Sequence, residues 1–128
     1  MLKIRLPKLV FVVLLLMPSL AHPAGLTIGT GSQMALNDGS LNVGGNVAIT
    51  GTLTVGSGSL ALTGNWSNSG AFTPGTGTVT FNGTNQSISG ATTFYNLTKN
   101  VTTATTLTFQ NGSASKTTIT NTLNLQGA

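Results

Sequence analysis

The sequence predicts an all-β chain that folds as a right-handed parallel β-helix, a solenoid of stacked coils, preceded by the helix of a signal peptide. A three-residue phrase recurs four times along the chain, and its apolar residues alternate with polar ones. The segments between these phrases are rich in glycine, serine and asparagine. Repetition at a period of roughly 20–50 residues is typical of solenoids, and alternation at period two is typical of strands.

The repeated phrase is a threonine between two larger apolar residues. Its central threonines recur at almost constant steps of 27, 26 and 28 (54−27, 80−54 and 108−80), which divides the chain into rows 26–51, 52–77, 78–105 and 106–128. The repetition leaves two coil lengths open. One is about 26 residues; the other is about 20, obtained by matching every third apolar pair. The four copies are Leu26-Thr27-Ile28, Leu53-Thr54-Val55, Val79-Thr80-Phe81 and Leu107-Thr108-Phe109.

Short strands are predicted wherever two apolar residues are separated by one residue, because such a pair points to one face of a strand. Matching every third pair aligns Ile28 with Ile49 and Met34 with Leu53. Asn-Gly turns such as Asn82-Gly83 would suit antiparallel hairpins, but the corners come faster than the spacing of about 8–12 residues in sandwiches. The pairs are Leu26/Ile28, Met34/Leu36, Leu41/Val43, Val47/Ile49, Leu53/Val55 and Leu60/Leu62.

Residues 1–21 have the three parts of a signal peptide. A basic start over 3–8 precedes an apolar run over 9–17, and Ser19 and Ala21 suit cleavage after Ala21. The run is too short to span a bilayer comfortably, and Pro18 interrupts it. We therefore expect a cleaved signal peptide over 1–21 and a secreted or cell-surface repeat segment over 22–128, which meets the membrane only in transit.

Charge and cysteine content exclude several classes of partner. Three of the five Lys and Arg residues lie in the predicted signal peptide, so residues 22–128 keep Lys99, Lys116 and the one acid, Asp38, for a net charge of +1 (2−1). Nucleic-acid binding normally requires clustered basic residues, so we expect no nucleic-acid partner. The absence of cysteine excludes disulfides and a lipoprotein anchor.

Residues capable of catalysis are nearly absent from the mature chain. Glycoside hydrolysis needs two carboxylates, whereas Asp38 is alone and its sequence Asn37-Asp38-Gly39 is typical of a turn. The single histidine, His22, would lie at the mature N-terminus, where no triad can hold it. We therefore expect a non-enzymatic protein with no catalytic residue, no metal site and no cofactor.

Aromatic residues and threonines are the only candidates for a ligand-binding face. Trp66 and Tyr95 would stack on sugar rings if exposed, and Thr54, Thr80 and Thr108 would form an outward ladder like those of ice-binding β-helices. The competing interpretation is that the large aromatics fill the coil interior, since such side chains are most often buried. These aromatics are Trp66, Phe72, Phe81, Phe94 and Phe109.

Two further motifs are more specific: Pro74-Gly75-Thr76-Gly77-Thr78-Val79-Thr80-Phe81-Asn82-Gly83 and Phe94-Tyr95-Asn96-Leu97. With the residues around them they resemble the repeat unit of large repetitive bacterial surface proteins, similar to filamentous adhesins with β-helical shafts. The resemblance covers about half of the mature chain and implies a secreted or cell-surface, adhesive protein without catalytic residues. Because such proteins run to many coils and end in an anchoring domain, we expect the chain to be part of a longer protein, or to associate through its C-terminal coil.

The function favoured by the sequence is that of a non-enzymatic structural or adhesin-like segment of an exported bacterial surface protein. The alternative is a carbohydrate- or ice-binding β-helix module that uses an exposed threonine and aromatic face. The expected partners are surface glycans or further copies of the chain.

Overall fold

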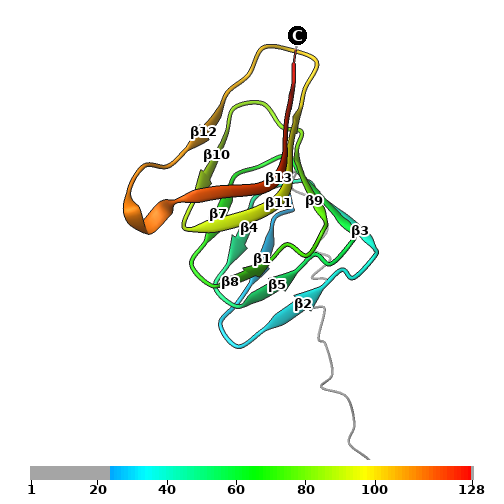
Figure 1. The fold of residues 1–128 in the computed structure, drawn as a ribbon, viewed down its shortest axis with the longest axis vertical. Coiled ribbons are helices and arrows are strands. Elements are labelled where there is room, and N and C mark those ends of the chain that lie inside the picture. The colour runs from blue at the N-terminus through cyan, green and yellow to red at the C-terminus, as the bar shows by residue number, and fades with distance from the viewer. Residues whose placement is uncertain (1–23, 128) are drawn as a thin grey trace, which may run out of the picture.

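The protein is described by a computed structural model over residues 24–127, so the predicted signal peptide and His22 lie outside the described residues. The chain winds into an all-β parallel solenoid of about four turns (Figure 1). Residues 24–127 contain no α-helix, and their one helical element is a 3-10 turn, η1 (Ser113–Ser115). The prediction of a parallel β-solenoid is confirmed.

Three parallel sheets form the walls of the solenoid, and successive strands of each coil belong to different sheets. Sheet A has the order β1-β4-β7-β10-β12, sheet B the order β2-β5-β8, and sheet C the order β3-β6-β9-β11-β13. The strands are β1 (Leu26–Ile28), β2 (Gln33–Ala35), β3 (Ser40–Val43), β4 (Val47–Ile49), β5 (Thr52–Thr54), β6 (Ser59–Leu62), β7 (Trp66–Asn68), β8 (Ala71–Thr73), β9 (Thr78–Phe81), β10 (Gln86–Ser89), β11 (Thr92–Asn100), β12 (Leu107–Phe109) and β13 (Thr117–Gln126).

The coil length follows from the strand register. Met34 pairs with Leu53 and Leu53 with Phe72, so the step from coil to coil in sheet B is 19 in both cases (53−34 and 72−53). Ile28 pairs with Ile49, a step of 21 (49−28). The shorter of the two predicted coil lengths is therefore correct for these coils, and the longer one is wrong for them.

The last step is longer. Leu97 of β11 pairs with Leu123 of β13, a step of 26 (123−97). Most of the additional residues lie between β11 and β12: Leu97 and Phe109 are 12 apart (109−97), whereas their counterparts Leu60 and Trp66 are 6 apart (66−60). The segment between β12 and β13 contains η1 and projects from the side of the stack (Figure 1). Coil length is thus set by what lies between the strands, while the strands keep their pairing.

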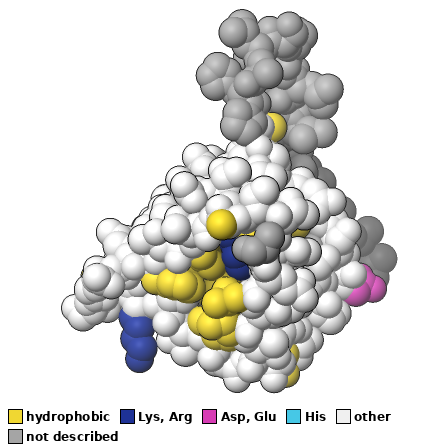
Figure 2. Space-filling model, turned by 90° about the horizontal axis from the view of Figure 1, so that it is seen from above, with side chains coloured by type: hydrophobic (Ala, Val, Ile, Leu, Met, Phe, Trp, Pro, Cys, Tyr) yellow, Lys and Arg dark blue, Asp and Glu magenta, His cyan; other side chains and the backbone are white. Residues whose placement is uncertain are grey.

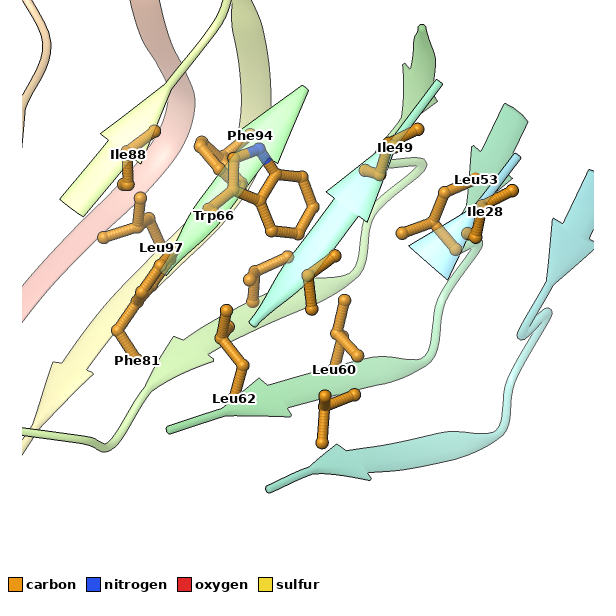
Figure 3. Packing of buried hydrophobic residues seen from close by; sticks show 13 residues of the cluster. Ile28, Ile49, Leu53, Leu60, Leu62, Trp66, Phe81, Ile88, Phe94 and Leu97 are labelled. Carbon is orange, nitrogen blue, oxygen red and sulfur yellow. The ribbon is translucent and has the colours of Figure 1, made fainter. Parts of the chain in front are cut away.

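Inward side chains stack in columns that run from coil to coil, as Figure 3 shows. One column in sheet C consists of successive register partners, and its three middle members are at most 2% exposed. All six predicted apolar pairs contribute residues to this interior or to its margin. Because a single coil has no second layer of side chains, each apolar residue is covered only when neighbouring coils are present. The column is Leu41, Leu60, Val79, Leu97 and Leu123.

The corners between sheets B and C show why glycine recurs in the sequence. Asn37, Gly56 and Gly75 occupy this corner in successive coils, and all three have positive φ, at 56°, 70° and 59°. A Cβ on Gly75 would overlap the carbonyl oxygen of Gly56, and a Cβ on Gly56 would overlap that of Asn37. Glycine is therefore required at both positions, by its conformation and by the close stacking of the corner below.

We expect Leu60→Ala to lower the free energy of unfolding by about 2–5 kcal/mol, because Leu60 is fully buried between two coils. The matched control is Leu123→Ala in the same column, where the side chain is 48% exposed. This control should cost clearly less. Urea denaturation of both variants measures the difference. Equal losses of unfolding free energy would contradict the deeper burial of Leu60 within the column.

Candidate functional site

Trp66, one of the two aromatics considered for sugar stacking, is buried in the solenoid interior. It is 0% exposed in β7, and its ring meets Phe72 edge-on with centroids 4.9 Å apart and Phe94 at 5.2 Å. Its indole Nε1 donates a hydrogen bond to Thr92 Oγ1 (3.1 Å), which satisfies the one polar group of the ring. The ring has no exposed face for a sugar, and the interior interpretation holds for this residue.

The remaining aromatics divide between interior and margin. Phe81 and Phe94 are fully buried, and Phe72 is half-buried against the same cluster. Phe109 is the register partner of the buried Ile88 and so occupies an inward position, but it is 37% exposed in the last described coil and does not fill the interior as predicted. Tyr95 is half-buried where the register between β11 and β13 shifts, between Phe94 and Asn96.

The three candidate threonines lie in three different sheets. Thr54 belongs to β5 in sheet B, Thr80 to β9 in sheet C and Thr108 to β12 in sheet A. The repeated phrase thus recurs after one full coil plus one strand, which moves each copy to the next wall. The structure therefore does not bring the threonines together, and the expectation that they form one ladder is wrong.

A ladder of asparagines at the corner before sheet A went unrecognised in the sequence. Asn46 Oδ1 accepts a hydrogen bond from the backbone N–H of Asn65 (2.8 Å), and Asn65 Oδ1 accepts one from Ser87 (2.8 Å). Asn85 Oδ1 continues the series by accepting from the N–H of Thr106 (3.0 Å). Each amide joins its own coil to the next one. An asparagine directly before three sheet-A strands was the available signal.

Lys99 is the most unusual side chain of the described region, because it is an almost fully buried lysine at an inward position. Its exposed fraction is 5%, and it lies in β11 between Phe81 of β9 and Leu125 of β13. Lys99 Nζ donates hydrogen bonds to the carbonyl oxygens of Gly83 (2.7 Å) and Thr84 (2.8 Å). A third hydrogen bond goes to Gln86 Oε1 (2.6 Å).

Gln86 completes this polar cluster. It is 3% exposed, and its Nε2 donates to the carbonyl oxygens of Leu62 (3.2 Å) and Gly64. Its Oε1 accepts from the N–H of Gly83 (2.9 Å) in addition to Lys99. The cluster therefore joins three coils at the corner between sheets C and A, with every proton of the ammonium group donated.

No side-chain carboxylate of the described residues balances the charge of Lys99, since the one acidic side chain of the chain, Asp38, lies in the first coil. Burial lowers the pKa of Lys99 below its ordinary value of 10.5, because desolvation disfavours the charged form. The three oxygen acceptors stabilise the ammonium group and limit this lowering. The hydrogen bonds of Lys99 and Gln86 thus join neighbouring coils.

Two hollows are present on the described surface. One, of about 310 Å³, lies at the C-terminal end, with Lys99, Leu107, Phe109 and Leu125 in its lining. Figure 2 shows hydrophobic side chains gathered on this end of the molecule, with a basic side chain between them. The other, of about 460 Å³, lies beside β8, the edge strand of sheet B. Its lining includes Asn68, Phe72, Thr93, Ser113, Lys116 and Thr118.

Over residues 24–127 no three His, Cys, Asp or Glu side chains gather as metal ligands would. The same span has no helix with the length and apolar character needed to cross a membrane. No protein-family model, curated protein or solved structure matches the chain.

Stability at alkaline pH tests the environment of Lys99. Its pKa is lower in the folded chain than in the unfolded chain, so between the folded pKa and 10.5 the unfolded chain binds more protons. The free energy of unfolding should therefore rise with pH across that window, by at most about 1.4 kcal/mol per pH unit. Urea denaturation at several pH values, compared with Lys99→Met, isolates this contribution. Identical pH profiles for the two proteins would show that burial does not lower the pKa of Lys99.

Proposed function

We propose that the described solenoid is a non-enzymatic structural segment of an exported bacterial surface protein, adhesin-like in architecture. The observation that carries the proposal is that the side chains best able to do chemistry are used to join coils. Lys99 and Gln86 bind carbonyl oxygens of neighbouring coils, and the asparagine ladder binds backbone N–H groups. Interactions of this kind stabilise a shaft and leave few groups for a substrate.

The exposed charges support the same proposal. Asp38 lies in the corner between β2 and β3 of the first coil, whereas Lys116 directly precedes β13 of the last coil. An acid–base pair for catalysis requires both groups within reach of one reacting centre. The two residues at opposite ends of the stack do not form such a pair.

The finer features of the proposal come from the sequence. We propose that the coils wind in a right-handed sense, that residues 1–21 direct export and are removed, and that the protein acts outside the cell. The resemblance to repetitive surface proteins of bacteria supports this setting. In this setting we propose that the protein crosses the membrane during export and binds neither membrane nor nucleic acid.

A carbohydrate-binding module is the second candidate, and the groove beside β8 favours it. There the half-buried Phe72 lies with Thr93, Thr118 and Lys116 in the lining. Sugars are commonly bound by an apolar ring together with a few polar groups in a concave site. This site replaces the face predicted from Trp66 and the three threonines, which the fold separates.

Export is tested by expressing the full chain in a bacterium with an epitope inserted at the exposed residue Asn111, between β12 and η1. We expect the protein in the medium or at the cell surface, with His22 as its first residue, because the small residues before it suit signal peptidase. Protease treatment of intact cells and N-terminal sequencing make the measurement. Intact Met1 on protein retained in the cytoplasm would contradict the proposal.

The two candidate functions differ in their response to Lys116→Ala. A sugar site in the groove predicts saturable glycan binding that weakens roughly tenfold or more in this variant, as expected for loss of a charged hydrogen bond. The structural proposal predicts no saturable binding by either protein. A glycan array followed by calorimetry distinguishes them, with Lys116→Arg as the variant that retains the charge.

A further inference from the structure

Among residues 24–127, three inward columns end without cover at the C-terminal end of the stack. Phe109, Leu123 and Leu125 are the large exposed hydrophobic residues of the described chain, at 37%, 48% and 64% exposure. Each is the last register partner in its column, above Ile88, Leu97 and Lys99 respectively. The exposed apolar surface is thus the solenoid interior seen at its end, and not a patch on its walls (Figure 2).

The same end carries two strand edges that pair with no described strand. β12 and β13 are the last strands of sheets A and C, and neither contains a charged residue. At the opposite end, β1 and β3 are the first strands of the same two sheets and are also uncharged. Natural proteins commonly protect exposed edges with charges or prolines, because an unprotected edge pairs with another chain.

We propose that the C-terminal end receives the N-terminal coil of a second copy of this chain, with β12 pairing with β1 and β13 pairing with β3. This inference deepens the proposed structural function and rests on it. The contact would continue the parallel coil-to-coil interface that already joins every coil within the chain. Because it joins two different surfaces of the same molecule, it does not close and extends into a filament.

The side chains at the two ends suit this pairing. Leu26 and Leu41 begin the columns that end at Phe109 and Leu123, and both are only partly buried against the core. The hollow of about 310 Å³ at the C-terminal end offers space for such inward side chains. A tail-to-tail contact between two C-terminal ends would instead reverse the strand direction, which occurs in none of the pairings within the described chain.

The test uses one variant that blocks each end. Leu125→Lys places a charge on the exposed C-terminal end. Thr27→Pro removes an N–H from the outer edge of β1, which pairs with no described strand. Residues 26 and 28 direct their backbone groups to the next coil, because Leu26 N–H donates to Asn46 O and Thr50 N–H donates to Ile28 O. Ser67→Lys, on the exposed outer side of β7, is the matched control.

Analytical ultracentrifugation of chains lacking residues 1–21 gives the readout, with circular dichroism to verify folding. All described strand ladders lie within 26–126, so this removal leaves them intact. We expect concentration-dependent linear oligomers for the unmodified chain and for Ser67→Lys, and monomers for each end variant alone. A 1:1 mixture of the two end variants should form heterodimers, because one C-terminal end and one N-terminal end remain free.

Three outcomes would overturn the inference. If the unmodified chain is monomeric, its C-terminal end does not bind a second copy. Dimers of Thr27→Pro alone would show tail-to-tail contact, and a mixture that stays monomeric would exclude the proposed pairing. None of these results would alter the export and surface measurements, so the structural proposal can survive failure of the assembly.

Discussion

Pairing of each coil with its neighbours is the constraint on which the rest of the structure depends. A coil of about 20 residues folds only if its apolar residues are covered from above and below, since its own side chains form a single layer. Burial of one such side chain contributes about 1.5–3 kcal/mol, which must offset about 1–2 kcal/mol of backbone entropy for each ordered residue. The free energy of unfolding therefore depends on the whole stack, and the apolar residues of the end coils are the least covered.

Polar side chains also join each coil to its neighbours. Asn46 and Asn65 each hold a backbone N–H of the following coil, and Lys99 holds carbonyl oxygens of the preceding corner. Buried polar groups are costly unless they are bonded, so each of these contacts favours one stacking register. These polar contacts therefore join the described coils and fix their register.

Much of the architecture could be predicted from the sequence, because inward residues alternate with outward ones whatever the coil length. The matches of Ile28 with Ile49 and Met34 with Leu53 are the true register. The threonine phrase suggested a coil of about 26 residues because its period spans one coil plus one strand. The pattern of apolar residues does not reveal the lengths of the corners, so it could not distinguish this period from the length of one coil. The role of Lys99 was hidden for another reason: its partners are mostly backbone oxygens, which any residue supplies.

The most direct test of the stacking register is cysteine cross-linking, for which this cysteine-free chain is well suited. Ser40 and Ser59 are exposed register partners on adjacent parallel strands, one coil apart in the sequence. Adjacent strands lie about 4.8 Å apart, within disulfide range, so the Ser40→Cys/Ser59→Cys variant should form an intramolecular disulfide under mild oxidation. The Thr27→Cys/Thr54→Cys pair, spaced by the sequence phrase but on different sheets, should not. Cross-linking of the second pair and not the first would contradict the strand register and the coil length of about 20 residues.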